Sequence, residues 1–170
     1  VPEAQAALSM LAFYRPGSVY VNTHAPESRT RWDLESTTFH EGVPGHYLER
    51  TCLMENADLL AWRRQLHIVS YTEGWALYSE RLAGELGLHT GPLDRLGMVA
   101  GDLLRSARLV VDSGMHALGW SPDRARRYMR DNTPYVAESV AFEIDRYLTT
   151  PGQASAYKLG QRAFLDARTE

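Results

Sequence analysis

Residues 37–50, TTFHEGVPGHYLER, decide where the helices of the first half of this chain can run. The stretch continues a helical pattern, but Pro44 lies in its middle between two glycines, Gly42 and Gly45. Proline cannot donate a hydrogen bond to a helix, and it disfavours helical geometry at the residue before it. Glycine tolerates backbone conformations that other residues avoid. We therefore predict a helical segment over 34–55 that is broken or bulged between the two glycines.

The same stretch carries a His-Glu pair, His40 and Glu41, followed by a second histidine, His46. Zinc peptidases commonly use H-E-x-x-H, in which both histidines lie one turn apart on one helix face. The gap here is longer, and because a helix turns by about 100° per residue, the two imidazoles would point to different sides of an ideal helix. A break in the helix could bring them together. The alternative is a chance cluster of His and Glu.

A catalytic zinc site needs a third protein ligand and an open position for water. The stretch YTEGWALYSERL, residues 71–82, has a helical pattern and supplies Glu73, with Glu80 two turns later on a similar face. The intervening chain has room for a helix and an antiparallel return, so Glu73 could join both histidines on one ion. Glu41 would then be the base that takes a proton from water.

The composition is that of an ordinary globular protein, with 170 residues, 44% hydrophobic and 23% charged. We expect a single domain over residues 1–170. The net charge of −3 does not indicate a nucleic-acid partner. No stretch reaches the ~18 apolar residues of a membrane span. The lone cysteine, Cys52, excludes an internal disulfide and a CxxC zinc knuckle.

Helical periodicity dominates the chain from residue 34 onward, so we predict a mainly α protein. After 34–55, the predicted helices cover 57–67, 70–86, 92–118, 122–131, 134–148 and 152–167. Ser121, followed by proline, marks a helix start, and Gly87 and Gly119 mark helix ends. Before this region we predict a short helix over 3–13 and one short edge strand within 15–23. The strand could pair with an extended substrate or be an ordinary surface strand.

The predicted helix over 92–118 carries a polar stripe of Arg105, Arg108, Asp112 and His116. Apolar residues flank the stripe, and the helix lacks Lys and Glu, which indicates a partly buried polar face that is paired or faces a ligand. His116 could stabilise an oxyanion, and either arginine could hold a substrate carboxylate. The alternatives are a structural role for His116 and an Arg–Asp network between packed helices.

Four blocks of the chain, together covering most of residues 35–160, resemble the bacterial domain-of-unknown-function family 885. In order, they are FHEGVPGHYLER, YTEGWALYSERLAGELG, RLVVDSGMHALGWS and EIDRYLTTPGQASAYKLG. This family is similar to the helical, zincin-related zinc metallopeptidases, and it carries His-Glu-x-x-Pro-Gly-His in place of H-E-x-x-H. The resemblance implies His40, His46 and Glu73 as ligands of one zinc ion and Glu41 as the base.

The last block supplies Tyr157 as a further candidate, because helical zinc peptidases often use a late tyrosine hydroxyl as an oxyanion donor. Core packing is the alternative for this residue. We expect Arg146, Glu80 and Asp112 to support the site by contacting the metal ligands without binding the metal themselves. For Arg146, an ordinary ion pair on a helix surface would produce the same pattern. One departure from the family is Tyr47, which stands where the family usually has a further histidine.

Family members are much longer, so we expect this chain to be the C-terminal, metal-binding part of such a protein. The chain starts without an initiator methionine or a signal-peptide pattern. The compartment stays open between the bacterial cytoplasm and a secreted or periplasmic location. A part of this kind could also associate through surface that the missing part would cover.

The favoured function is a zinc-dependent hydrolase, a metallopeptidase that cleaves a peptide or another small amide. The alternative is a non-catalytic helical binding module, or a fragment with an incomplete cleft. A third reading, a carboxylate-bridged di-iron bundle, needs Glu-x-x-His pairs on two helices. The residues three positions after Glu41 and Glu73 are Pro44 and Ala76, so the sequence lacks both pairs.

Overall fold

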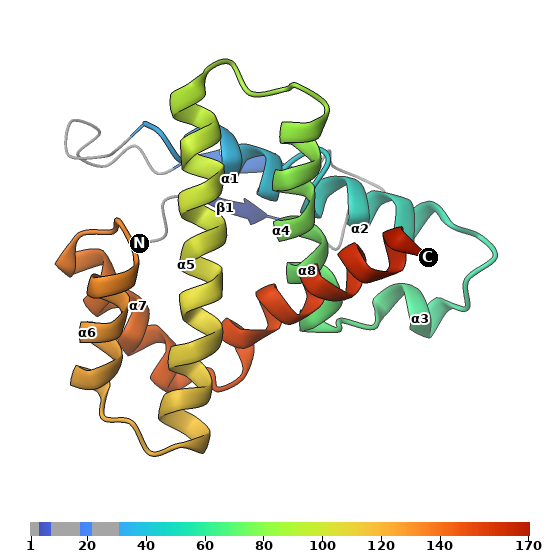
Figure 1. Ribbon diagram of the computed structural model, residues 1–170. Helices are drawn as coiled ribbons and strands as arrows, with labels where there is room; N and C mark the ends of the chain where they lie inside the picture. Colours follow the sequence, from blue (N-terminus) through green and yellow to red (C-terminus); the bar gives the residue numbers. More distant parts are fainter. Residues whose placement is uncertain (1–3, 8–17, 22–30) are drawn as a thin grey trace. The chain divides into compact units, whose positions relative to one another are not determined.

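The structure, a computed structural model, describes residues 4–7, 18–21 and 31–170. The protein is mainly α, as its periodicity predicts (Figure 1). The described elements are β1 (Ala4–Ala7), β2 (Ser18–Val21), α1 (Leu34–Glu41), α2 (His46–Glu55), α3 (Ala61–Gln65), α4 (Val69–Glu85), α5 (Pro92–Ala117), α6 (Pro122–Asn132), α7 (Ala137–Thr149) and α8 (Gln153–Thr169). In this part of the chain, no helix has the length and apolar character that a membrane crossing requires.

The predicted helix boundaries at serine and glycine are confirmed. Ser121 precedes α6, and its hydroxyl accepts a hydrogen bond from the backbone N–H of Arg124 at 3.2 Å. Gly87 and Gly119 follow the ends of α4 and α5 with φ values of 70° and 67°. After Gly119, the backbone N–H of Trp120 donates to the carbonyl oxygen of Gly114 at 2.9 Å, a contact typical of a helix that ends at glycine.

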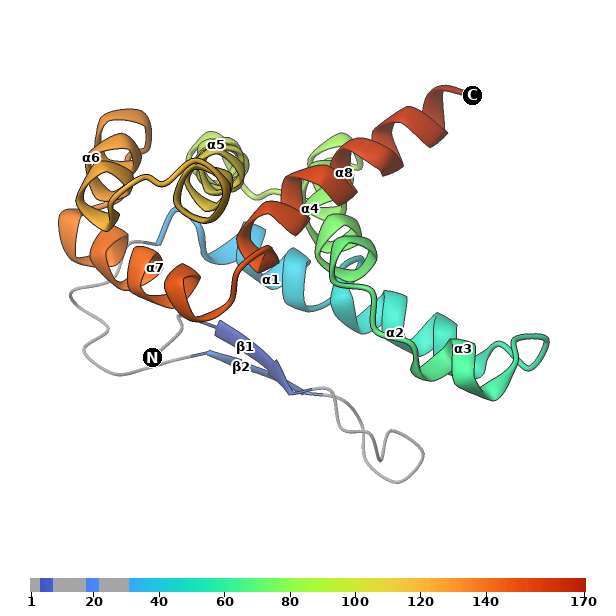
Figure 2. The same cartoon turned by 90° about the horizontal axis from the view of Figure 1, so that it is seen from below.

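Two predictions for the first half of the chain are wrong. Residues 4–7, predicted as helix, form β1, which pairs antiparallel with β2 (Figure 2). Pairing with a neighbouring strand overrides the helical preference of this alanine-rich segment; the rest of the predicted helix lies outside the described residues. The helix predicted over 57–67 shortens to α3, none of whose residues is buried. Without a packed face, a helix of this length gains little stability.

The helices form two compact units. The first contains the described parts of residues 1–68 together with 75–98, and the second contains 69–74 and 99–170. Helices α4 and α5 therefore each have residues in both units.

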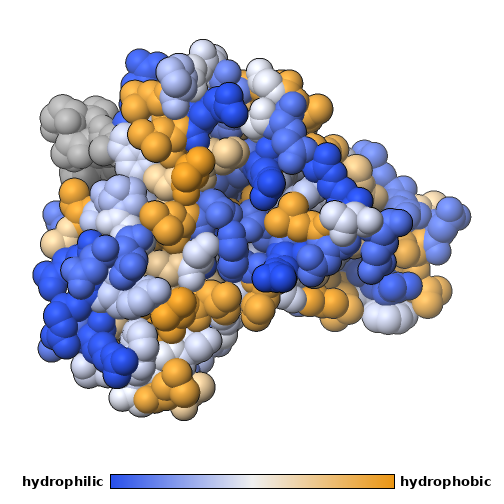
Figure 3. Space-filling model, in the orientation of Figure 1, coloured by the Kyte–Doolittle hydropathy of each residue, from blue (hydrophilic) through white to orange (hydrophobic). Residues whose placement is uncertain are grey.

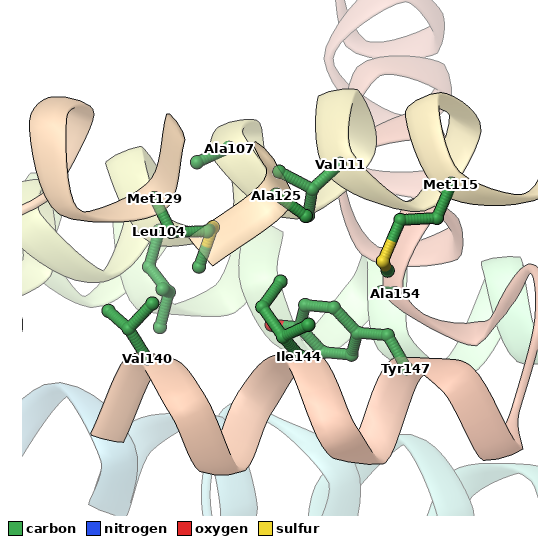
Figure 4. Close-up of a cluster of buried hydrophobic side chains, with 10 residues drawn as sticks. All are labelled: Leu104, Ala107, Val111, Met115, Ala125, Met129, Val140, Ile144, Tyr147 and Ala154. Carbon is green, nitrogen blue, oxygen red and sulfur yellow. The ribbon is translucent and has the colours of Figure 1, made fainter. Parts of the chain in front are cut away.

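The second unit contains an apolar core built from α5, α6, α7 and the start of α8 (Figure 4). Burying a large apolar side chain contributes roughly 1.5–3 kcal/mol, so this cluster is the main stabilising element of the unit. Its buried members are Leu104, Ala107, Val111, Met115, Ala125, Met129, Val140, Ile144, Tyr147 and Ala154.

Helix α5 buries part of its polar stripe and exposes part of its apolar one. Arg108 and Asp112 are only 7% and 2% exposed, whereas Val99 and Leu103 are 55% and 44% exposed. Apolar residues run along the position of α5 on the face shown in Figure 3. The prediction of a buried polar face is thus confirmed at two of its four positions.

A pair of glycines lets α8 approach the first turns of α4 within the second unit. A Cβ atom at Gly160 would clash with the backbone carbonyl oxygen of Ser70, and one at Gly74 would clash with the backbone of Gly160. Backbone atoms cannot move aside as a flexible side chain can. The two helices therefore pack at a distance that only glycine permits, next to Glu73 of α4.

We expect Gly160→Ala to lower the free energy of unfolding by about 1–3 kcal/mol, because the added methyl group forces α4 and α8 apart. Urea unfolding followed by far-UV circular dichroism measures the change. Arg162→Ala, on an exposed position of the same helix, is the matched control and should change stability little. Equal effects of the two substitutions would contradict the close glycine contact.

Candidate metal centre

The predicted interruption between the two histidines is a complete break, not a bulge. α1 ends at Glu41, and α2 begins at His46. The backbone N–H of Gly42 still donates to the carbonyl of Thr38 at 2.8 Å, which closes the last turn of α1. A Cβ atom at Gly45 would clash with the carbonyl oxygen of His40, so only glycine lets the chain return this closely against α1.

This return brings the two histidines together, as the zinc interpretation requires. The ring centroids of His40 and His46 are 4.8 Å apart, and the rings are nearly perpendicular. One ligand atom from each of His40, Glu41 and His46 lies within 4.8 Å of the other two. Both imidazoles are buried, while Glu41 is partly exposed. Two imidazole nitrogens beside a carboxylate fit the ligand preferences of zinc.

Glu80 of α4 determines which nitrogen of His40 carries a proton. Its Oε1 lies 2.7 Å from Nδ1 of His40, and its Oε2 accepts a hydrogen bond from Ser36 Oγ at 2.6 Å. An ionised carboxylate only accepts hydrogen bonds, so Nδ1 of His40 carries the proton. A histidine whose Nδ1–H donates to a carboxylate is typical of zinc sites in which Nε2 binds the metal. The predicted supporting role of Glu80 therefore has a direct contact.

Helix α4 also holds the turn between α1 and α2. The indole Nε1 of Trp75 donates to the carbonyl oxygen of Pro44 at 2.9 Å. One turn and a half later, the same helix presents Glu80 to His40. The part of α4 that belongs to the first unit, from residue 75 onward, thus supports both the turn and His40.

Glu49 is a buried carboxylate that the sequence analysis did not single out. It lies one turn after His46 on the same side of α2 and is 8% exposed. Burial raises the pKa of the Glu49 carboxyl, while the nearby His46 and Arg50 act in the opposite direction. Among the described residues, no atom forms a hydrogen bond with its Oε2. The i, i+3 spacing from His46 was the signal that could have identified it.

Glu73, the predicted third ligand, belongs to the second unit. It lies on α4 two turns before Glu80. Its Oε1 accepts a hydrogen bond from Nε2 of Gln153 on α8 at 3.2 Å. The convergence of Glu73 with His40 and His46 draws on both units and stays a prediction.

Tyr157 lies beside Glu73 through the same glutamine. The Nε2 group of Gln153 also donates to the Tyr157 hydroxyl at 2.9 Å. Tyr157 is buried, and the guanidinium carbon of Arg108 lies 4.9 Å from the centre of its ring. Gln153 itself was not predicted; its position four residues before Tyr157, on the same helix face, was the available signal.

Arg108, predicted to hold a substrate carboxylate, is paired with the protein's own residues. Its Nη2 lies 2.6 Å from Oε2 of Glu143, and its Nε donates to the Tyr147 hydroxyl at 2.7 Å. These contacts favour the structural alternative for Arg108. Arg105 is partly buried, and its Nη1 lies 3.4 Å from the carbonyl of Gly101 on its own helix.

The charged cluster around Glu143 is strongly coupled. Burial alone would raise the pKa of Glu143, but the guanidinium groups of Arg108 and Arg146 and a hydrogen bond from the Tyr147 hydroxyl lower it to about 2. Burial raises the pKa of Tyr147 well above its ordinary value. Both residues therefore stay in one protonation state at neutral pH, as expected of a structural cluster.

Asp112 and His116 also serve the helix packing of the second unit. The Asp112 carboxylate accepts hydrogen bonds from the backbone N–H groups of Gly152 at 3.2 Å and Ser155 at 3.0 Å, and so caps α8. Nε2 of His116 lies 3.1 Å from the carbonyl oxygen of Tyr147. Because a carbonyl only accepts, this nitrogen donates, and the contact supports the structural interpretation of His116.

Arg146, predicted to support a metal-binding carboxylate, contacts the residue that holds Glu73. Its Nη1 donates to Oε1 of Gln153 at 3.2 Å, and its Nη2 lies 3.1 Å from Glu143. The supporting role is therefore indirect, through the Gln153 amide.

We expect Glu143→Gln to destabilise the protein at pH 7 by roughly 3 kcal/mol, the value of a pKa shift from 4.5 to about 2. Because the folded-state pKa is depressed, this stability is present above about pH 4.5 and is lost as pH falls towards 2. The wild-type free energy of unfolding should fall over that range more steeply than that of the variant. Urea unfolding at several pH values measures both.

Glu138→Gln is the matched control for this experiment, since Glu138 is an exposed residue of the same helix. It should leave the stability at pH 7 within about 0.5 kcal/mol of wild type. A Glu143→Gln protein with the stability and pH dependence of Glu138→Gln would contradict the coupled cluster.

One sequence family matches the chain almost throughout. Its description is "Bacterial protein of unknown function (DUF885)", and the match covers residues 3–170. No curated protein sequence matches the chain.

Solved structures similar to this chain include two bacterial proteins. A "putative lipoprotein" from Colwellia psychrerythraea has a TM-score of 0.94 and 36% identity over 99% of this chain. A "putative lipoprotein of unknown function" from Shewanella oneidensis has a TM-score of 0.76 and 22% identity over 99% of this chain, a similarity that concerns the fold alone. The chain spans 29% and 33% of the lengths of these two proteins.

Proposed function

The chain belongs to the DUF885 family of bacterial proteins, and from this premise we propose that it forms the metal-binding part of a zinc-dependent hydrolase. The substrate would be a peptide or another small amide. The observation that carries the proposal is the buried hydrogen bond between Glu80 and Nδ1 of His40, beside His46, because zinc-binding histidines typically make such a carboxylate contact.

The donor set fits zinc, and His40, His46 and Glu73 would hold the ion. When bound, zinc would act as a Lewis acid on the scissile carbonyl and lower the pKa of a water molecule. Glu41, adjacent to a ligand and partly exposed, would accept the proton of the attacking water and deliver it to the leaving amine. Tyr157 would donate a hydrogen bond to the oxygen that becomes negatively charged in the transition state.

Arg108 was predicted to hold a substrate carboxylate. Arg108 is neutralised by Glu143, so the proposed mechanism assigns it no substrate contact. A residue that binds the end of the substrate would then lie in a region corresponding to the part of the similar proteins that this chain does not span, about two thirds of their length. For that reason, metal binding is tested on this chain, and turnover is tested on the longest protein that contains it.

We expect the purified chain to contain about one zinc ion, lost in His46→Ala and kept in Glu41→Gln, because the first substitution removes a ligand and the second only the base. Elemental mass spectrometry gives the metal content. In the longer protein, Glu41→Gln should abolish cleavage of a peptide library while the metal stays bound. A well-folded wild-type chain without stoichiometric metal would refute the hydrolase mechanism.

Glu80→Gln tests the hydrogen bond that carries the proposal. The amide keeps the shape of the side chain but accepts more weakly, so zinc affinity should fall by about 10–100-fold. Competition with a chromophoric chelator measures the affinity. Glu85→Gln, an exposed position on the same helix, should leave it unchanged.

We also propose that the protein works outside the bacterial cytoplasm. Support comes from the similar structure of Colwellia psychrerythraea, which is 36% identical to this chain and is described as a "putative lipoprotein". Fractionation of the source cells, followed by immunodetection, should find the protein in the envelope or the medium. Recovery in the cytoplasmic fraction alone would rule the proposal out.

A further inference from the structure

We infer that Gln153 is a positioning residue that orients the carboxylate of Glu73 and makes the Tyr157 hydroxyl a hydrogen-bond donor. The inference rests on the proposed function, because it concerns two residues proposed for the site. It adds a residue to which the motif pattern assigns no role. All the contacts that carry it lie within the second unit.

The first step is the orientation of the Gln153 amide. A guanidinium group only donates hydrogen bonds, so the amide atom that faces Nη1 of Arg146 at 3.2 Å must be the carbonyl Oε1. The Nε2 group then faces the other way, towards Glu73 and Tyr157. Arg146 is itself held by Glu143, at 3.1 Å from its Nη2. The orientation of the Gln153 amide is therefore set by the Arg146 guanidinium, which can only donate hydrogen bonds.

The second step is what the two hydrogens of Nε2 do. One points to Oε1 of Glu73 at 3.2 Å, and the other to the Tyr157 oxygen at 2.9 Å. Because the Tyr157 oxygen accepts from the amide, its own hydrogen is directed away from Gln153. The hydroxyl thus acts as a donor towards other groups, the polarity that a developing oxyanion needs. A reversed amide would place a carbonyl oxygen against Glu73 and draw the tyrosine proton towards itself.

The third step is the rigidity of the support. Gln153 is the first residue of α8, whose first turn is held by the buried Asp112 carboxylate through two backbone N–H groups. Further along α8, the contact between Gly160 and α4 sets the separation from the turn that carries Glu73. A positioning residue must itself be held in place, and here helix caps, close packing and an arginine supply that restraint.

The decisive variant is Gln153→Glu, which keeps the size of the side chain but cannot donate to either partner. The new carboxylate would repel Glu73 and would accept a hydrogen bond from the Tyr157 hydroxyl. We expect zinc affinity, measured with a competing chelator, to fall by about 10–100-fold. In the longer protein we expect kcat to fall more than KM rises, because donation to an oxyanion stabilises the transition state only.

Gln161→Glu is the matched control. Gln161 lies on the same helix, is buried, and also donates from Nε2 to a carboxylate, that of Asp102, at 2.9 Å. Its substitution removes a comparable amide–carboxylate hydrogen bond, the one made with Asp102. Both variants should lose stability in urea unfolding, but only Gln153→Glu should lose zinc affinity. Equal losses of zinc affinity in the two variants would overturn the inference. Gln153→Ala, which adds no charge, replaces Gln153→Glu if that variant does not fold.

A readout without metal separates this inference from the proposed function. In protein labelled with ¹³Cζ-tyrosine, the Tyr157 resonance is assigned by its loss in Tyr157→Phe. We expect it to shift in metal-free Gln153→Glu and to stay in place in Gln161→Glu. An unchanged resonance in Gln153→Glu overturns the inference, whatever the metal content. If the wild-type chain binds no zinc but the Tyr157 resonance still shifts in Gln153→Glu, the proposed function and the metal-positioning part of the inference are overturned. The effect of Gln153 on the Tyr157 hydroxyl then still holds.

Discussion

The absence of a side chain at Gly45 is the constraint on which the candidate centre depends. It allows the chain to fold back against the carbonyl oxygen of His40, so that α2 can begin with His46 directly beside the end of α1. The longer spacing of the motif is therefore accommodated by two helices joined by a turn, where H-E-x-x-H uses one helix. Pro44 contributes its carbonyl oxygen to Trp75, which ties the turn to α4.

Buried charge, more than apolar contact, determines the arrangement around the functional residues. Glu80 is satisfied by His40 and Ser36, and Asp112 by the first turn of α8. Such groups cost free energy when they lose a partner, and they add little net stability when paired. Their effect is to select one geometry. The apolar cluster of the second unit (Figure 4) supplies stability, while these polar contacts orient the side chains.

Several site residues could be predicted because their chemistry is local. The proline and glycines of residues 42–45 indicated a break, and the break is what joins His40 and His46. The polar stripe of α5 indicated burial, which the structure confirms for Arg108 and Asp112. The pattern could not show their partners. Glu143 and the start of α8 are distant in sequence, and helical periodicity reports which face is buried without reporting what covers it.

The sequence by itself determined the mainly α class, the helix ends at glycine and serine, and the His-Glu and His residues of the candidate centre. These depend on local dihedral preferences and on residue types that metals prefer. Only the tertiary structure decided that residues 4–7 pair as a strand, that Nδ1 of His40 donates to Glu80, and that Gln153 of α8 contacts Glu73 of α4. The contacts of His40 with Glu80 and of Glu73 with Gln153 join residues far apart along the chain. Their formation depends on which helices pack together, and no local pattern encodes that packing.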